Sequence, residues 1–443
     1  MDKINSDTQV SDLINSTVGL EVETHRINAK GELSRYDYPH GLLDEKQHHF
    51  IKNDFLETQS ELITPPTTTT QRALNYLGAY HQALRGELAA GEYLWPNSMP
   101  PKLRADHSDI IIAHTDQDNY EYRQKVARIR KIERTAETGV HVNVGLTAQS
   151  INQLSGKRNQ AAVDQAYLQA AVGFMQYRWL LTYLFGATPL AFGNYFAKDT
   201  PAPTHPVRSL RNSHFGFGNG FLTSYQSVSD YVDGILEAVK TDALIADREY
   251  YGSVRLKQTG GVEKLRTAGI AYIELRMFDL DPFEPYGISA DAVNLVRLMF
   301  AYFVAKQPFD LSNADQEIRE AQGLNERVAL EDPLESCEYQ DKANELIRNL
   351  QRFSADIVVP FSAQQLCFKM QERLDNPALT PSARMTKWTD ATADRLLDLL
   401  VKFAKGYQDD LIHNPTIGFE NLSPVEQRAI LEKLRQGQNV EIK

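Results

Sequence analysis

Three short segments of the chain alternate apolar residues with residues that can chelate a metal. They are residues 20–25 (LEVETH), 140–144 (VHVNV) and 272–277 (YIELRM). Residues i and i+2 of a β-strand lie on one face, so each segment would have an apolar face and a charged or polar face. A fourth segment, residues 54–61, adds further carboxylates. Carboxylates crowded on one face of a sheet repel one another unless cations lie between them, which predicts a metal–nucleotide site on a β-sheet.

The polar faces carry the groups that hard divalent cations prefer. Carboxylate oxygens with one imidazole are typical of Mg²⁺ or Mn²⁺ sites and not of zinc or copper sites. The candidate ligands are Glu21, Glu23, Asp54, Glu61, His141 and Glu274. Taken singly, two glutamates on one strand face are more often solvated, and a lone histidine is more often structural. The recurrence of the pattern in three segments favours the metal site.

Arginines accompany these features. Arg276 would share a strand face with Glu274, where it forms either an ion pair or a bidentate clamp on a phosphate. Arg208 and Arg211 lie in residues 192–222, a stretch rich in Gly, Asn, Pro, His and Phe that is typical of a long functional loop. Such a loop could help close a pocket. An arginine there suits a substrate carboxylate, whereas ordinary surface charge is the alternative, and we expect it for Arg208 in preference to Arg211.

Several other kinds of catalytic site are absent from the sequence. There is no GxxxxGK[ST] motif, no GxGxxG that opens a helix and no GxSxG motif. The two cysteines, Cys337 and Cys367, have neither zinc-site spacing nor the context of a nucleophile, so we expect two free thiols. Metal-assisted phosphoryl transfer, which depends on positioning and electrostatics, is the chemistry that remains.

Composition limits the class of protein. The chain has 443 residues, 42% of them hydrophobic, and a formal net charge of -11. This is ordinary globular composition, and the charge argues against a nucleic-acid or anionic-membrane partner. Residues 1–15 are polar, with no apolar core of a signal peptide, and no run of about 18 apolar residues occurs. We therefore expect a cytoplasmic protein, either a monomer or a dimer.

Local patterns predict a mixed α+β chain. The length alone suggests two or three domains, but the pattern is that of one domain over residues 1–443, with a sheet-containing core at about 15–290 and a helical region at about 291–443. We expect a polar leader or helix over residues 1–17 and a hairpin turn at 28–31. Helices are expected near residues 70–90, 119–135, 157–185, 230–246, 293–305, 343–353, 389–411 and 424–435, the last with a capping box.

Several segments of the sequence, taken together, resemble a known protein family. An ordered set of segments over about residues 18–288 is similar to bacterial glutamate–cysteine ligase, and to the N-terminal ligase module of bifunctional glutathione synthetases. The segments are residues 19–28 with Gly31, 53–55 and 61–65, 94–100, 122–123, 139–143, 185–189, 209–211, 272–276 and 281–283. The resemblance implies a glutamine-synthetase-like fold, in which a curved, mainly antiparallel sheet forms the active-site wall and helices pack behind it.

The resemblance also implies roles for individual residues. The six candidate ligands would hold Mg²⁺ ions around the phosphates of ATP, with Mn²⁺ as an alternative ion. Arg276 would contact the transferring phosphoryl group, with Glu274 beside it. Arg211 and Arg123 would bind amino-acid carboxylates, and Phe55 and Tyr122 would lie near a cysteine pocket. Asn143 is assigned to substrate binding with them. The chain departs from the family pattern at Thr135, where a glutamine is expected, and at Phe217, where a tyrosine is expected.

The expected reaction joins L-glutamate to L-cysteine. ATP would phosphorylate the γ-carboxylate of glutamate, and the cysteine α-amine would displace the phosphate to give γ-glutamylcysteine. A chain that ends at residue 443 would lack the second, ATP-grasp domain that forms glutathione, so it is expected to stop at the dipeptide. Two alternatives stay open: a ligase that joins glutamate to another small amine, and a non-catalytic relative that binds nucleotide or metal.

Overall fold

We describe the protein from a computed structural model. The structure describes residue 13 and residues 15–39, 41–42, 48–155, 159–196, 201–218, 220–355 and 361–442. Most of the leader expected over residues 1–17 therefore lies outside the described residues. Within the described part, no helix is long and apolar enough to cross a membrane.

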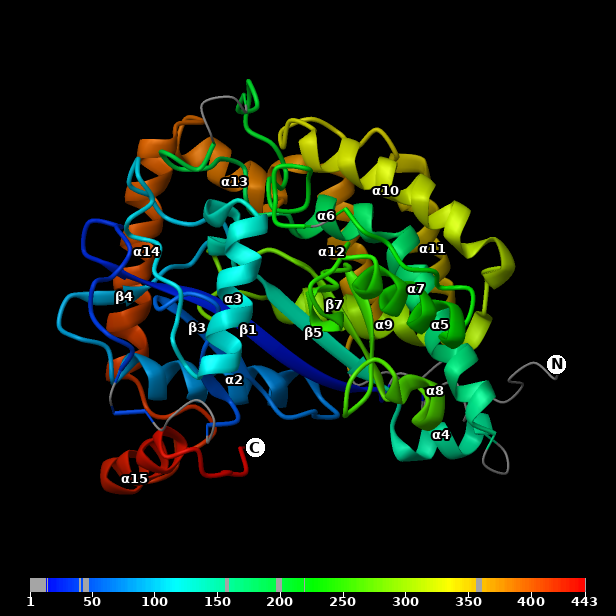
Figure 1. Ribbon diagram of the computed structural model, residues 1–443, viewed down its shortest axis with the longest axis horizontal. Coiled ribbons are helices and arrows are strands. Elements are labelled where there is room, and N and C mark those ends of the chain that lie inside the picture. The colour runs from blue at the N-terminus through cyan, green and yellow to red at the C-terminus, as the bar shows by residue number, and fades with distance from the viewer. Residues whose placement is uncertain are drawn as a thin grey trace.

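A seven-stranded sheet runs through the middle of the molecule (Figure 1). Its strand order is β2-β3-β1-β5-β7-β6, and β4 pairs with the far end of β1. The strands are β1 (Thr17–Asn28), β2 (Ile51–Asn53), β3 (Gln59–Ile63), β4 (Glu92–Leu94), β5 (Val140–Gly145), β6 (Val254–Lys257) and β7 (Tyr272–Phe278). Each of these pairings is antiparallel. The mainly antiparallel sheet expected from the sequence is confirmed.

The strand alternation separates an apolar face from a charged face, as predicted. Val22, Val142 and Leu275 are fully buried on the apolar face. Three helices pack against that face: α2 (Thr70–Arg85), α5 (Gln160–Gln176) and α9 (Ala290–Lys306). Removing this much apolar surface from water fixes which face of each strand points inward, and the charged residues are left on the other face.

Further helices surround this core (Figure 1). They are α3 (Gln117–Ile129), α4 (Ala148–Ser155), α6 (Arg178–Phe185), α7 (Val228–Lys240), α8 (Lys264–Ala268), α10 (Ala314–Leu330), α11 (Gln340–Ala355), α12 (Ala363–Asp375), α13 (Pro381–Trp388), α14 (Ala393–His413) and α15 (Pro424–Arg435). Short 3-10 turns occupy Ile132–Ala136, Asp247–Glu249, Leu311–Asn313 and Pro377–Leu379.

Each predicted helix has a counterpart, with differences at its ends. The predicted helix over residues 157–185 is divided at Tyr177 into α5 and α6. The capping box of α15 is confirmed, because Ser423 and Glu426 bond to each other's backbone. Helices α4, α8, α10, α12 and α13 were not predicted. Cys337 and Cys367 are buried free thiols, as expected.

The expectation for Arg208 was wrong, because this side chain is fully buried. Its Nε lies 2.8 Å from a carboxylate oxygen of Glu331. The guanidinium also donates to two backbone carbonyls, and it stacks on the ring of Tyr183 with 4.1 Å between its central carbon and the ring centroid. Arg208 therefore ties the 192–222 segment to the chain after α10.

We predict that Arg208→Met lowers the free energy of unfolding by about 3–5 kcal/mol, because it leaves the Glu331 carboxylate and the carbonyls without their partner. Urea denaturation followed by circular dichroism would measure the loss. Arg327→Met, at a half-exposed arginine of α10, is the control and should cost less than about 1 kcal/mol. Equal losses in the two variants would contradict this structural role.

Candidate active site

The acidic residues of β1 meet their partners through the strand register. Glu21 lies opposite His141 of β5, and Glu23 lies opposite Glu61 of β3. On the next strand, Glu274 of β7 lies opposite Asn143. Residues directly opposite each other in an antiparallel pair project from the same face. The register therefore gathers side chains that are far apart in sequence onto the charged face of the sheet.

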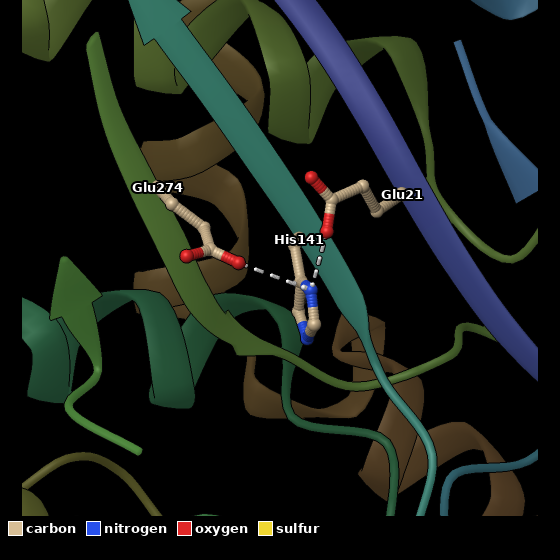
Figure 2. Close-up of side chains that lie close together, drawn as sticks. All are labelled: Glu21, His141 and Glu274. Atoms are coloured by element: carbon tan, nitrogen blue, oxygen red, sulfur yellow. Dashed lines mark hydrogen bonds and ion pairs between the residues drawn. The ribbon is translucent and has the colours of Figure 1, made fainter. Parts of the chain in front are cut away.

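Glu21, His141 and Glu274 form the tightest group (Figure 2). They project from three adjacent strands, and one ligand atom from each lies within 4.8 Å of the others. His141 Nδ1 is 3.1 Å from Glu21 Oε2 and 3.6 Å from Glu274 Oε1. Its Nε2 is 3.5 Å from Glu23 Oε1. The His141 and Glu274 side chains are each only 1% exposed.

Several buried polar atoms in and beside this group have no hydrogen-bond partner in the described part of the chain. They are His141 Nε2, Asn143 Oδ1 and Glu274 Oε2, the last of which has only ion pairs, the shorter with Lys257 Nζ at 3.2 Å. A buried acceptor without a partner is costly, so atoms of this kind point to a missing ligand. If the His141 Nδ1–H donates to Glu21, the Nε2 lone pair is free to bind a cation. The residues present therefore suit a hard divalent cation held by oxygen atoms and one imidazole.

A cavity of about 240 Å³ adjoins this group. Its acidic wall is made by Glu23, Asp54 and Glu61, and His141 also lines it. Five of the six predicted metal ligands lie on β1, β3, β5 and β7, and Asp54 directly follows β2. Glu57, in the same segment as Asp54, instead accepts the backbone N–H of Tyr38 at 2.8 Å. His25, on the same face of β1, is held by Thr58 and the carbonyl of Ala136.

The carboxylates perturb one another strongly. Burial, and then the charge of Glu23, raise the pKa of Asp54 to about 6. Burial and three neighbouring carboxylates raise the pKa of Glu61 well above its usual range. Burial acts in the same direction on Glu274, but Arg276, Arg255 and Lys257 outweigh it and hold the pKa of Glu274 well below its usual range. Around Asp54 and Glu61 the nearby cations therefore do not offset burial and carboxylate repulsion, whereas around Glu274 they do.

The cations around Glu274 include two that sequence reasoning missed. Arg276 Nη1 lies 2.8 Å from Glu274 Oε1, as its predicted ion pair requires. Lys257 Nζ and Arg255 Nη1 lie 3.2 and 3.6 Å from Glu274 Oε2. Both missed residues lie on β6, where the run VRLK puts them on the charged face. A four-residue alternation is too short to stand out without the neighbouring strand.

The other wall of the cavity suits an amino acid. It includes Arg178 and Arg211, the second of which donates to the backbone carbonyls of Arg276 and Phe278. Phe55, Thr135 and Phe217 also line this cavity. So does Glu137, a missed carboxylate that accepts hydrogen bonds from the Tyr195 hydroxyl and from the Phe217 N–H. Burial raises the pKa of Glu137 to about 7.

Three residues assigned to substrate binding do not line the cavity. Asn143 donates to Glu21 Oε1 at 2.8 Å and so orients a predicted ligand. Arg123 donates to the carbonyl of Ala113 at 3.0 Å, although its charge still lowers the pKa of Asp54. The guanidinium of Arg248 stacks on the ring of Tyr122, with 3.7 Å between its central carbon and the ring centroid.

The raised pKa values give a testable link between pH and stability. A carboxyl whose pKa is higher in the folded protein favours folding at low pH, and this contribution is lost as pH rises through the folded pKa, about 6 for Asp54. We predict that Mg²⁺ stabilises the protein at pH 8 but hardly at pH 5, with a gain of about 2.7 kcal/mol at roughly 100 times its Kd. Thermal unfolding with Mg²⁺ or with EDTA at both pH values would measure this. Equal shifts at the two pH values, or a shift that survives in Glu61→Gln, would contradict it.

An antiparallel sheet thus carries clustered carboxylates beside a cavity lined with arginines, an arrangement that suits a divalent cation and anionic ligands. The family model described as "Glutamate-cysteine ligase" matches residues 1–245 and 222–326. The chain belongs to the glutamate–cysteine ligase family.

Similar proteins agree with this assignment. A glutathione biosynthesis bifunctional protein, GshAB, of Streptococcus agalactiae is 33% identical over 97% of this chain and 58% of its own length. The crystal structure of a bifunctional glutathione synthetase from Pasteurella multocida has a TM-score of 0.89 at 28% identity, over 98% of this chain and 58% of that one. The glutamate–cysteine ligase of Francisella tularensis, solved in complex with AMP, has a TM-score of 0.84 at 21% identity and shares the fold, over 95% of this chain and 92% of that one. The chain thus spans little more than half the length of the bifunctional relatives.

Proposed function

We propose that the protein joins the γ-carboxylate of L-glutamate to the α-amine of L-cysteine with the hydrolysis of ATP to ADP and phosphate. The main support is the charged face of the sheet, where buried acceptors without partners adjoin a cavity that has carboxylates on one wall and arginines on the other. Membership of the glutamate–cysteine ligase family supports this choice of reaction. We infer that the described sheet and helices act as one ligase domain.

The acidic residues would hold the divalent cations of the nucleotide. Glu21, His141 and Glu274 would form one ligand group, and Glu23, Asp54 and Glu61 would form a second. Mg²⁺, or Mn²⁺ in its place, supplies neutralisation and alignment of the triphosphate when it is bound. Asn143 keeps Glu21 in position through its hydrogen bond.

The arginines would act on the reacting groups. In the first step, a γ-carboxylate oxygen of glutamate attacks the γ-phosphorus of ATP and ADP leaves. Arg276 lies on the charged face between Glu274 and the cavity, where its guanidinium can stabilise the charge on the phosphoryl oxygens. Arg211 would hold an amino-acid carboxylate, since it lines the cavity and is fixed by two carbonyls.

In the second step, the cysteine amine attacks the carbonyl carbon of the γ-glutamyl phosphate, and phosphate leaves as the amide forms. Water must be excluded, because it would hydrolyse the acyl phosphate. Arg211, Asn212 and Phe217 all come from the 192–222 segment and line the cavity. We propose that this segment closes over the substrates. Unchanged protease sensitivity of the segment on addition of ATP and both amino acids would count against closure.

The reaction is tested by phosphate release from ATP with Mg²⁺ and glutamate, with cysteine or 2-aminobutyrate as the acceptor. We expect release only when both amino acids are present, and mass spectrometry should find the γ-glutamyl dipeptide. Release with larger amines in preference to cysteine would favour the alternative ligase. Nucleotide binding without release with any acceptor would favour a non-catalytic, regulatory role.

A further inference from the structure

A second cavity lies on the opposite face of the sheet from the catalytic carboxylates. Val22 and Thr24 of β1 line it, and these residues alternate with Glu21 and Glu23 along the same strand. Helices α2 and α14 form other parts of its wall, through His81 and Tyr407 among others. The cavity volume is about 20 Å³, which is room for one particle of about the size of a water molecule.

Two side chains of α2 present unpaired nitrogen atoms at this cavity. His81 and Arg85 both line it, and they are only 2% and 3% exposed. Among the residues that the structure describes, neither ring nitrogen of His81 has a hydrogen-bond partner, and neither does Nε of Arg85. They lie four residues apart, so they share one face of the helix. Buried polar atoms rarely lack partners, and three of them together indicate a ligand.

The positive charge of Arg85 indicates that the missing ligand of this cavity is an anion. Its Nη1 donates to the neutral amide of Gln408 at 3.1 Å, and it forms no ion pair with the residues that the structure describes. Glu284 also lines the cavity, but its charged neighbours are Asp281, Arg373, Asp291 and Arg384, and Arg85 is not among them. A buried guanidinium without an anion is strongly unfavourable. Water would bond to the N–H groups without neutralising the charge, whereas a small anion would do both.

We propose that this cavity binds one halide-sized anion, chloride under ordinary salt conditions, between Arg85 Nε–H and a ring N–H of His81. The volume of about 20 Å³ suits a single-atom anion better than a phosphate or a carboxylate. The anion would neutralise Arg85 where α2 and α14 meet the apolar face of the sheet, and it would therefore stabilise the packing behind the strand that carries Glu21 and Glu23. This inference does not depend on the proposed reaction.

The test compares chloride with gluconate, an anion too large for the cavity. Thermal unfolding of the full chain is measured at constant ionic strength while sodium chloride replaces sodium gluconate. We expect the Tm to rise and to saturate with chloride in the wild type and in Arg72→Gln, a control at a partly exposed arginine of the same helix. The rise should be absent in Arg85→Gln. A Tm that is the same in both salts would overturn the proposal.

A crystal of the wild-type protein in sodium bromide gives a second readout, which does not require Arg85→Gln to fold. We expect an anomalous bromide peak within about 3.5 Å of Arg85 Nε, on the side that faces His81. Electron density for water alone at this place would overturn the proposal. A bromide peak without a saturable rise in Tm would mean an adventitious ion only, and it would overturn the proposal too.

Discussion

Replacing Glu23 by glutamine should reduce kcat for ATP-dependent ligation by about a thousandfold, the upper range for the loss of one preorganised electrostatic contact. The side chain lines the cavity, and its Oε1 lies 3.5 Å from His141 Nε2. Glutamine keeps the shape of the side chain and removes one negative charge from the proposed Mg²⁺ ligands. Phosphate release at saturating ATP, glutamate and cysteine would measure the change.

The same variant should need more Mg²⁺ for half-maximal activity, because the remaining carboxylates attract the cation less strongly. Glu32→Gln is the matched control, since Glu32 lies exposed in the turn after β1 and away from the cavity. Its kcat should stay within a factor of about two of the wild type. A Glu23→Gln enzyme that keeps wild-type kcat and Mg²⁺ dependence would exclude this residue from the metal site.

Replacing Arg276 by glutamine should lower kcat by about a hundredfold to a thousandfold while ATP affinity changes by less than about tenfold. The reason is that a phosphate clamp acts mainly when charge shifts onto the transferring phosphoryl group. The competing explanation is that Arg276 only neutralises Glu274, with which it forms an ion pair at 2.8 Å. In that case the variant would lose stability and keep its kcat per folded molecule.

Three measurements on one preparation separate these explanations: kcat, nucleotide affinity by fluorescence titration, and the free energy of unfolding in urea. Arg266→Gln, at an arginine of α8 that pairs with Asp233 on the surface, serves as the control for loss of a guanidinium. A near-normal kcat in Arg276→Gln, together with a large loss of stability, would contradict the assignment to phosphoryl transfer.

The charged face of the sheet could be predicted because its pattern is local. A period of two places Glu21 and Glu23 on one side of a strand whatever the strand pairs with. Its register across β5 and β7 could not be read from the sequence, and this register decides that His141 meets Glu21 and Glu274. The resemblance to the ligase family implied that these residues share a metal site, but not how their strands pair.

Other features depend on contacts between distant parts of the chain. Arg208 looked like a surface residue because its partner, Glu331, is 123 residues away. Arg255 and Lys257 lie on a strand of only four residues, which has too little pattern to be recognised. The break between α5 and α6 at Tyr177 has no proline, and the nearest glycine, Gly173, lies one turn earlier inside α5. Tertiary packing must therefore determine where the helix breaks.

Alternate side chains of β1 project into the apolar core and onto the charged face of the sheet. This alternation restricts how the length of the strand can vary among relatives. A single residue inserted or deleted between Gly19 and Glu23 would turn Val22 toward the charged face of the sheet and put a carboxylate into the apolar core. Substitutions that keep the alternation of apolar and polar residues can be accommodated in β1, but length changes should be confined to its flanking turns. In a deep mutational scan, single-codon deletions within β1 should be as damaging as nonsense codons, whereas deletions in the turn at residues 29–32 should be tolerated far more often.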